Sequence, residues 1–225
     1  MRLLGTLALA AGLALVAGCS NSDSGSNANG GADGDASTGG GSGGDTASHV
    51  VLDGFVSSGP WQGSGFTATD PGAATITPDC TSGCVPPFTG SDFCMQGTVT
   101  GRADYTGFAM LGWNVNQPAG ADPGTWAVPD TGGITVTVSN MPSTVALRVQ
   151  VQGTDPHSGA DRWCAPLTSG KLIAWSDFKT NCWQGGMPQD PLTPGTMIQQ
   201  GSVMVPGLVT ALPFDVCLID LQITP

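Results

Sequence analysis

Glutamate is absent from this sequence, and basic residues are scarce. All 17 acidic residues are aspartate, and only 6 residues are lysine or arginine. Glutamate, lysine and arginine usually fill the exposed faces of helices, so their scarcity argues against a helical protein. Nucleic acid is excluded as a partner, because phosphate binding needs clustered basic side chains. The few basic residues here are scattered along the chain.

Glycine and proline are abundant instead, with 35 and 17 residues, which is typical of strands joined by many turns. Apolar residues alternate with polar ones over 109–115, 134–138 and 147–151. Alternation with period two, between Gly, Pro and Asn turns, predicts an all-β fold, an antiparallel β-sandwich or barrel. Further strands are expected at 50–55, 73–77, 93–100, 171–174, 201–205 and 214–224, with one helical turn, capped by Ser176, at 176–179.

The N-terminus has the features of an export signal. Arg2 precedes an apolar run, 3–16, that is too short to span a bilayer comfortably. The run ends in Val16, two small residues and Cys19, a pattern that resembles the lipobox of bacterial lipoproteins. The resemblance implies a signal peptide at 1–18, cleavage before Cys19, and a diacylglyceryl thioether on its sulfur. An ordinary secretory signal followed by a chance cysteine is the alternative.

A polar segment separates this signal from the rest of the chain. Residues 20–48 consist of Gly, Ser, Asn, Asp, Ala and Thr, without a large apolar side chain. Together with the lipidated Cys19 they are expected to form a disordered tether. Ser20, by resemblance to the sorting rule of Gram-negative lipoproteins, implies the outer membrane. The prediction is a cell-envelope protein that contacts the membrane through its lipid.

The remaining residues, 49–225, are expected to form one domain. The order of its motifs resembles the galactose-binding-domain-like jelly roll, the fold of many carbohydrate-binding modules. The stretches that carry this resemblance are Trp-Gln-Gly-Ser-Gly at 61–65, residues 93–99 and 105–114, Trp-Ser-Asp-Phe at 175–178 with Cys182 and Trp183, and residues 214–221. The resemblance implies glycan binding. It also implies a structural calcium ion near the first and last strands, with Asp53 and Asp220 as candidate ligands; no other cofactor is expected.

Six cysteines remain once Cys19 is set aside, enough for three disulfides in an oxidising compartment. Two expected pairs each flank a short excursion of the chain. The third is implied by the jelly-roll resemblance, in which an early strand and the last strand are neighbours. The expected bridges are Cys80–Cys84, Cys164–Cys182 and Cys94–Cys217. Six cysteines allow many other pairings, and a zinc site is not expected because no C-x-x-C pair is present.

Tryptophans are the main ligand-binding candidates, because sugars stack their C–H faces on aromatic rings while polar side chains bind the hydroxyls. Trp163 is the leading candidate, with Arg162 and Asp161 as charged neighbours in a loop held by Cys164. Trp61 and Trp126 occupy turn-like contexts and are also candidates for exposure. For any single tryptophan taken alone, a place in the core is the favoured interpretation. Trp113, Trp175 and Trp183 lie in core-like segments, and Asn114, Asn116 and Gln117 are further hydrogen-bonding candidates.

Catalytic signatures are missing, and we expect a protein that is not an enzyme. Two histidines, His49 and His157, could act as a general base, but the sequence has no Gly-x-Ser-x-Gly motif to provide the nucleophile. A glycosidase would need two carboxylates, for which the candidates are Asp177, Asp215 and Asp220. The favoured function is a carbohydrate-binding envelope lipoprotein. The alternatives are a structural or partner-binding envelope lipoprotein and, last, a glycan hydrolase; exposed clustered tryptophans would favour the first function and buried ones the second.

Overall fold

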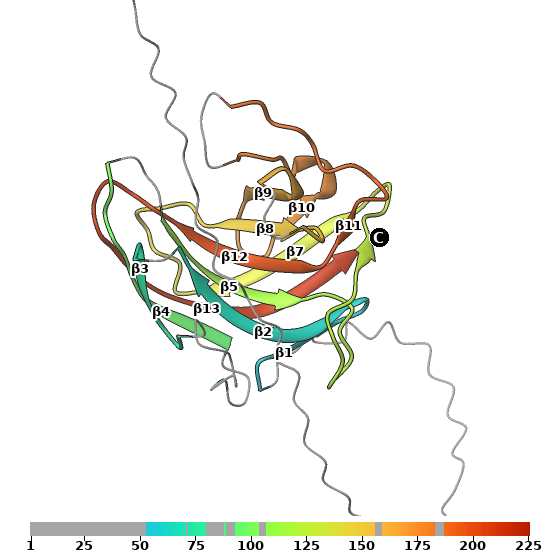
Figure 1. Cartoon of the computed structure of the whole chain (residues 1–225), viewed down its shortest axis with the longest axis horizontal. Helices are drawn as coiled ribbons and strands as arrows, with labels where there is room; N and C mark the ends of the chain where they lie inside the picture. The colour runs from blue at the N-terminus through green and yellow to red at the C-terminus, as the bar shows by residue number, and fades with distance from the viewer. Residues whose placement is uncertain are drawn as a thin grey trace, which may run out of the picture.

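The computed structural model describes residues 53–70, 72–79, 88, 93–103, 107–155, 159–182 and 187–225. These residues form two antiparallel β-sheets that pack face to face, and none of them is in an α-helix (Figure 1). The predicted all-β sandwich is therefore confirmed.

The described strands form a six-stranded sheet, a five-stranded sheet and a two-stranded ribbon. Sheet I has the order β1 (Phe55–Ser58), β2 (Trp61–Thr69), β5 (Phe108–Asn114), β12 (Gln200–Pro206), β8 (Arg148–Gln152), β9 (Arg162–Pro166). Sheet II has the order β10 (Leu172–Ala174), β7 (Gly133–Ser139), β13 (Leu212–Thr224), β4 (Phe93–Val99), β3 (Ala74–Thr77). The ribbon pairs β6 (Trp126–Ala127) with β11 (Met197–Ile198), and two short 3-10 turns are η1 (Gly159–Asp161) and η2 (Trp175–Asp177).

The strand order is that of a jelly roll. In sheet II the late strand β13 lies between the early strands β4 and β7, and in sheet I β12 lies between β5 and β8. The chain passes from sheet to sheet between these strands, so that two Greek keys interlock. The hairpin β1–β2 extends sheet I beyond β5, and β3 extends sheet II beyond β4.

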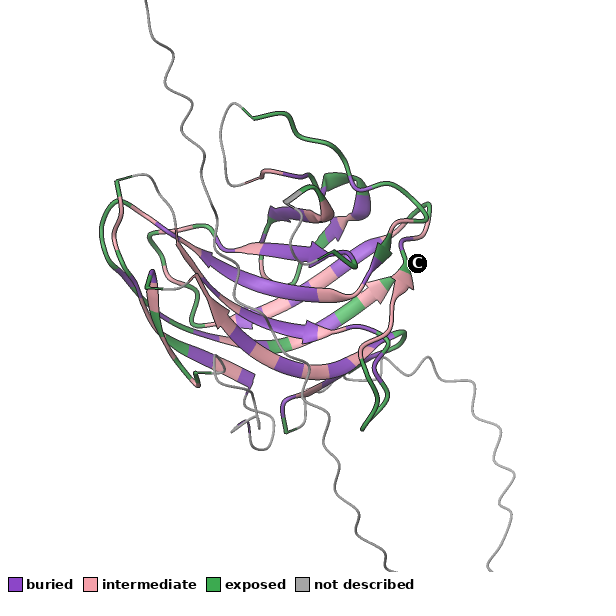
Figure 2. Ribbon diagram, viewed as in Figure 1, coloured by how far each residue is buried: buried purple, intermediate pink, exposed green. Residues whose placement is uncertain are grey.

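The hydrophobic core lies between the two sheets, and strand alternation explains which side chains enter it. In β7 the apolar residues Ile134, Val136 and Val138 are buried, whereas the intervening threonines are half-buried. Figure 2 shows the same alternation of buried and more exposed residues along β2. A register shift between Leu218 and Asp220 of β13 acts as a β-bulge, which returns Leu221 to the core face after Leu218.

Two local expectations differ from the structure. Of the strand predicted at 50–55, only 53–55 are among the described residues; Asp53 and Gly54 have positive φ angles that turn the chain, and β1 begins at Phe55. The turn predicted at 176–179 is η2, one residue earlier, and Ser176 does not cap it; Ala174 precedes the turn, and no side-chain cap is present.

Two of the three predicted disulfides are confirmed. Cys94 in β4 and Cys217 in β13 are direct cross-strand partners in sheet II, with their Cα atoms 3.9 Å apart. Cys164 in β9 is bonded to Cys182, and their Cα atoms are 5.8 Å apart. The third pair, Cys80–Cys84, lies outside the described residues, as do Cys19, His49, His157 and Trp183.

Candidate functional site

The expected exposure of Trp163 is wrong. This side chain is only 8% exposed and belongs to the hydrophobic core. It lies in β9, directly opposite Val151 of β8, whose side chain also faces the core. Because β9 alternates, Arg162 and Cys164 project from the outer face of sheet I while Trp163 points inward.

Trp61 is also a core residue, contrary to expectation, with an exposed fraction of 0%. Its ring lies 6.4 Å from that of Trp113, 5.6 Å from Trp126 and 5.8 Å from Trp175. Trp113 and Trp175 are buried, as their core-like sequence context predicts. Trp126 is half-buried at the edge of this cluster and stays a candidate for contact with a ligand. The described residues therefore contain no cluster of exposed tryptophans.

The two charged neighbours of Trp163 have different environments. A carboxylate oxygen of Asp161 accepts a hydrogen bond from the backbone N–H of Asp155, 2.7 Å away, so Asp161 stabilises its own loop. The same carboxylate lies so close to Gly153 that a β-carbon there would collide with it. The guanidinium of Arg162 is half-buried; burial lowers its pKa, and the charge of Asp155 acts in the opposite direction.

Polar side chains cover the outer face of sheet I instead. Strand register places Asn114, Gln200, Gln152 and Arg162 in one cross-strand row, and Ser202, Gln150 and Cys164 in the next. We call the group Asn114, Gln150, Gln152, Gln200 and Ser202 the amide face. These side chains share one face of the sheet because directly opposed residues point the same way.

Three residues of the amide face are buried although they point away from the core. Gln150 is 6% exposed, Gln152 is 9% exposed and Ser202 is 3% exposed. Among the described residues, no side-chain hydrogen bond of these three is formed. The amide face therefore holds hydrogen-bonding capacity that the described part of the chain does not use.

The other end of the amide face is organised by a hydrogen-bond network. Gln200 donates to the side chain of Asn114 at 3.1 Å, and Asn114 donates to the side-chain oxygen of Gln117 at 3.0 Å. Gln117 also accepts from the Ser64 backbone and donates to Ala121. The predicted candidates Asn114 and Gln117 thus meet, whereas the Asn116 amide bonds the backbone of Thr125 and supports the adjacent loop.

Phe66 provides an aromatic ring on the same outer face. It is half-buried in β2, opposite Gly112 of β5. A β-carbon at Gly112 would collide with the tip of the Phe66 ring, so the ring lies over the glycine backbone. Gly112 is itself opposite Ser202. One cross-strand row therefore runs from an aromatic ring to Ser202 and Gln150.

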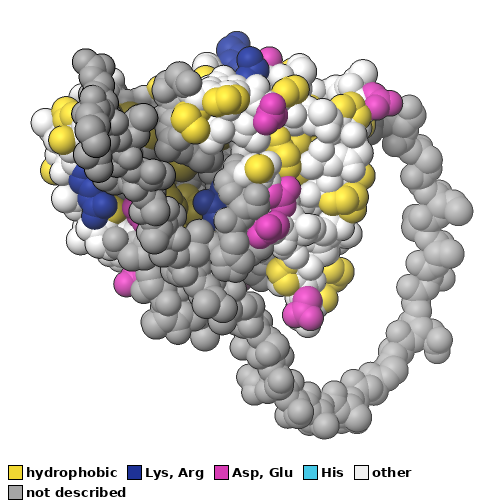
Figure 3. All heavy atoms as spheres, turned by 45° about the horizontal axis from the view of Figure 1, so that its top comes forward, with side chains coloured by type: hydrophobic (Ala, Val, Ile, Leu, Met, Phe, Trp, Pro, Cys, Tyr) yellow, Lys and Arg dark blue, Asp and Glu magenta, His cyan; other side chains and the backbone are white. Residues whose placement is uncertain are grey.

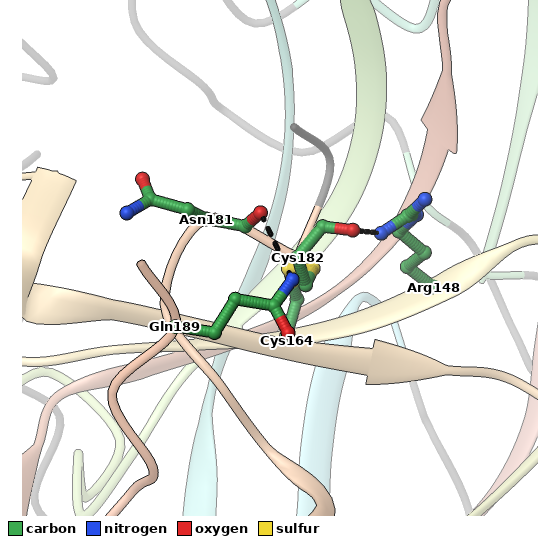
Figure 4. Close-up of a disulfide and its surroundings, with 5 residues drawn as sticks. All are labelled: Arg148, Cys164, Asn181, Cys182 and Gln189. Atoms are coloured by element: carbon green, nitrogen blue, oxygen red, sulfur yellow. Dashed lines mark hydrogen bonds between the residues drawn. A yellow bond between two sulfur atoms is a disulfide. The ribbon is translucent and has the colours of Figure 1, made fainter. Parts of the chain in front are cut away.

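A cavity of about 310 Å³ lies where this row reaches β9. Its lining residues are Arg148, Cys164, Pro166, Asp177, Lys179, Cys182 and Gln189. The Arg148 guanidinium donates to the backbone carbonyl of Cys182, next to the Cys164–Cys182 disulfide (Figure 4). The Gln189 amide donates to the Asn181 carbonyl at 3.5 Å. Burial lowers the pKa of Arg148.

The carboxylates considered for glycoside hydrolysis are not brought together. Asp215 and Asp220 both lie in β13 of sheet II, five residues apart, which is about 16 Å along an extended strand. The separation needed between two catalytic carboxylates is at most about 10 Å. Asp177 lines the cavity over sheet I, the other layer of the sandwich. This arrangement does not support hydrolysis by Asp215 and Asp220.

The two candidate calcium ligands lie on different segments of the chain. Asp53 precedes β1, and Asp220 lies at the bulge of β13, where its side chain accepts a hydrogen bond from Gln222. No group of three or more His, Cys or Asp residues suited to a metal ion occurs in the described ranges. No helix within those ranges has the length and apolar character needed to cross a membrane.

Comparisons with known proteins give no assignment. No protein-family model matches this chain, and no curated protein matches it. The candidate site therefore depends on the strand register and side-chain environment described above.

Proposed function

We propose that this chain is a bacterial envelope lipoprotein whose jelly-roll domain binds carbohydrate on the outer face of sheet I. The observation that carries the proposal is the amide face, where Gln150, Gln152 and Ser202 point away from the core and make no side-chain hydrogen bond with other described residues. The galactose-binding-like order of sequence motifs supports the same class of ligand.

Carbohydrate chemistry fits these groups. Each sugar hydroxyl both donates and accepts hydrogen bonds, as do side-chain amides and the serine hydroxyl. The Phe66 ring, in line with Ser202 and Gln150, offers an apolar surface for a sugar C–H face. The row crosses several strands spaced about 4.8 Å apart, which favours an extended oligosaccharide over a single sugar.

Replacing Gln150 with leucine should weaken glycan binding about two- to tenfold. The change keeps a side chain of similar size and removes hydrogen bonds worth about 0.5–1.5 kcal/mol each. A glycan array with the full chain in mild detergent would select the ligand, and calorimetry would compare the affinities. Gln222→Leu, on the exposed part of β13 in sheet II, is the matched control and should bind normally. Equal affinity of both variants would contradict a site on the amide face.

A second candidate, a structural or partner-binding envelope lipoprotein, is favoured by a specific observation. Four of the tryptophans, Trp61, Trp113, Trp163 and Trp175, belong to the hydrophobic core, so their rings are not available for stacking on a sugar. The glycan array separates the two functions. If the array detects no ligand for the unmutated chain, the second function replaces the first.

Lipidation of Cys19 is part of the same proposal, and Cys19→Ala tests it. The variant lacks the sulfur that receives the diacylglyceryl group, so it should lose partitioning into the detergent phase. Each buried methylene contributes about 0.8 kcal/mol, so loss of the acyl chains removes most of the membrane affinity. Phase separation of cell extracts with a detergent measures the change. A variant that partitions like the unmutated chain would show that Cys19 is not the anchor.

A further inference from the structure

The cavity beside the Cys164–Cys182 disulfide is chemically distinct from the amide face. Two of the five basic side chains after Arg2, Arg148 and Lys179, line the cavity, and Arg162 projects from β9 on the same face. Lys179 forms a β-bridge with Cys164, so its side chain shares the outer face of sheet I with Gln150. On the face drawn in Figure 3, basic side chains are few and occupy separate positions.

Arg148 is a partly buried cation without a carboxylate partner among the described residues. Its guanidinium donates to the carbonyl oxygen of Cys182, and Figure 4 shows this as its contact beside the disulfide. Burial lowers the pKa of Arg148. A ligand carboxylate bound at Arg148 would supply a bidentate partner, because a guanidinium fork pairs with two carboxylate oxygens.

We propose that this cavity binds the carboxylate of an acidic glycan, such as a uronate residue, through Arg148 and Lys179. The inference rests on the proposed function and gives the glycan a charge. The cavity continues the row formed by Ser202, Gln150 and Cys164, so a single oligosaccharide can occupy both the amide face and the cavity. Asp177 also lines the cavity, and its charge disfavours a doubly charged phosphate more than a singly charged carboxylate.

The acidic composition of the protein does not prevent this binding. The net charge of -11 includes the aspartates of residues 20–48. Exposed charges farther away than the Debye length, about 8 Å at physiological ionic strength, are largely screened. Arg148 is half-buried, so a contact with its guanidinium is screened less.

The test compares oligogalacturonate and alginate oligosaccharides with their carboxyl-reduced, neutral counterparts. The full chain in mild detergent should bind a carboxylated form at least about tenfold more tightly than its neutral counterpart. Arg148→Gln and Lys179→Gln should each remove most of this preference while leaving the affinity for the neutral form within about twofold. Lys171→Gln, beside β10 at the edge of sheet II, is the matched control and should retain the preference.

Each outcome has one meaning. Equal binding of the carboxylated and neutral forms would overturn the anionic cavity and leave glycan binding intact. Binding of neither form, together with a negative glycan array, would overturn the proposed function itself. If Arg148→Gln unfolds the protein, two experiments replace it. The first is the variant Arg148→Lys. The second measures, in the unmutated protein, how far oligogalacturonate protects Arg148 from modification by phenylglyoxal. Modification at an unchanged rate would then contradict the proposal.

Discussion

Trp61→Ala should lower the free energy of unfolding by about 3–5 kcal/mol, the range found when a buried aromatic side chain is truncated to alanine. The ring is fully buried and lies within 6.4 Å of three other indole rings. Alanine would leave a cavity between the two sheets. For a domain of this size, the melting temperature should fall by about 6–20 °C, measured by circular dichroism.

The companion variant Trp61→Phe distinguishes packing from hydrogen bonding. The indole nitrogen of Trp61 is buried and has no hydrogen-bond partner. Phenylalanine keeps an aromatic ring and removes this unpaired N–H, so it should cost much less than alanine. Trp126→Ala, at the half-buried edge of the cluster, should lower the free energy of unfolding by an amount between those of Trp61→Phe and Trp61→Ala. A small effect of Trp61→Ala would show that the aromatic cluster is not a major source of stability.

Removing the Cys94–Cys217 disulfide is expected to have the second large effect. The bridge joins residues separated by 123 positions, and in the chain-entropy account a loop of this length contributes about 4–5 kcal/mol. Cys94→Ala with Cys217→Ala should therefore shift the urea midpoint strongly toward lower concentration. The result would establish that the link between β4 and β13 restricts the unfolded chain.

The second bridge is a built-in comparison. Cys164 and Cys182 are separated by only 18 positions, so the double alanine variant of this pair should cost about 3 kcal/mol. When all disulfides are reduced, both double variants and the unmutated protein should have the same urea midpoint, apart from small packing differences. If the short bridge contributes more than the long one, loop length does not control the stabilisation.

Local alternation was sufficient to predict β5, β7 and β8, whereas β2 and β9 were not predicted as strands. Ile134, Val136 and Val138 alternate with threonines, and the structure buries these three residues in β7 as expected. The pairing of Cys94 with Cys217 also agrees with the jelly-roll resemblance. These features depend on short-range patterns or on the order of motifs, both of which can be recognised in a single sequence.

The site was harder to predict because it depends on non-local pairing. Trp163 is surrounded by turn-forming and charged residues in the sequence, but its burial follows from the pairing of β9 with β8. Gln150 and Ser202 are 52 positions apart, and only the insertion of β12 beside β8 makes them neighbours. Polar residues at alternate positions of a strand are predicted to point their side chains away from the core. This pattern does not reveal which polar residues of other strands share the same cross-strand row.

The position of β13 has a consequence for biogenesis. This strand follows all other described strands in the chain, yet it pairs with both β4 and β7 at the centre of sheet II. A nascent chain that has not reached Leu212 lacks the strand that connects the two halves of that sheet. Long-range pairing of this kind delays folding. In the proposed envelope lipoprotein such a delay would keep the chain unfolded, and so acceptable to the translocation machinery, until its last strand has been synthesised.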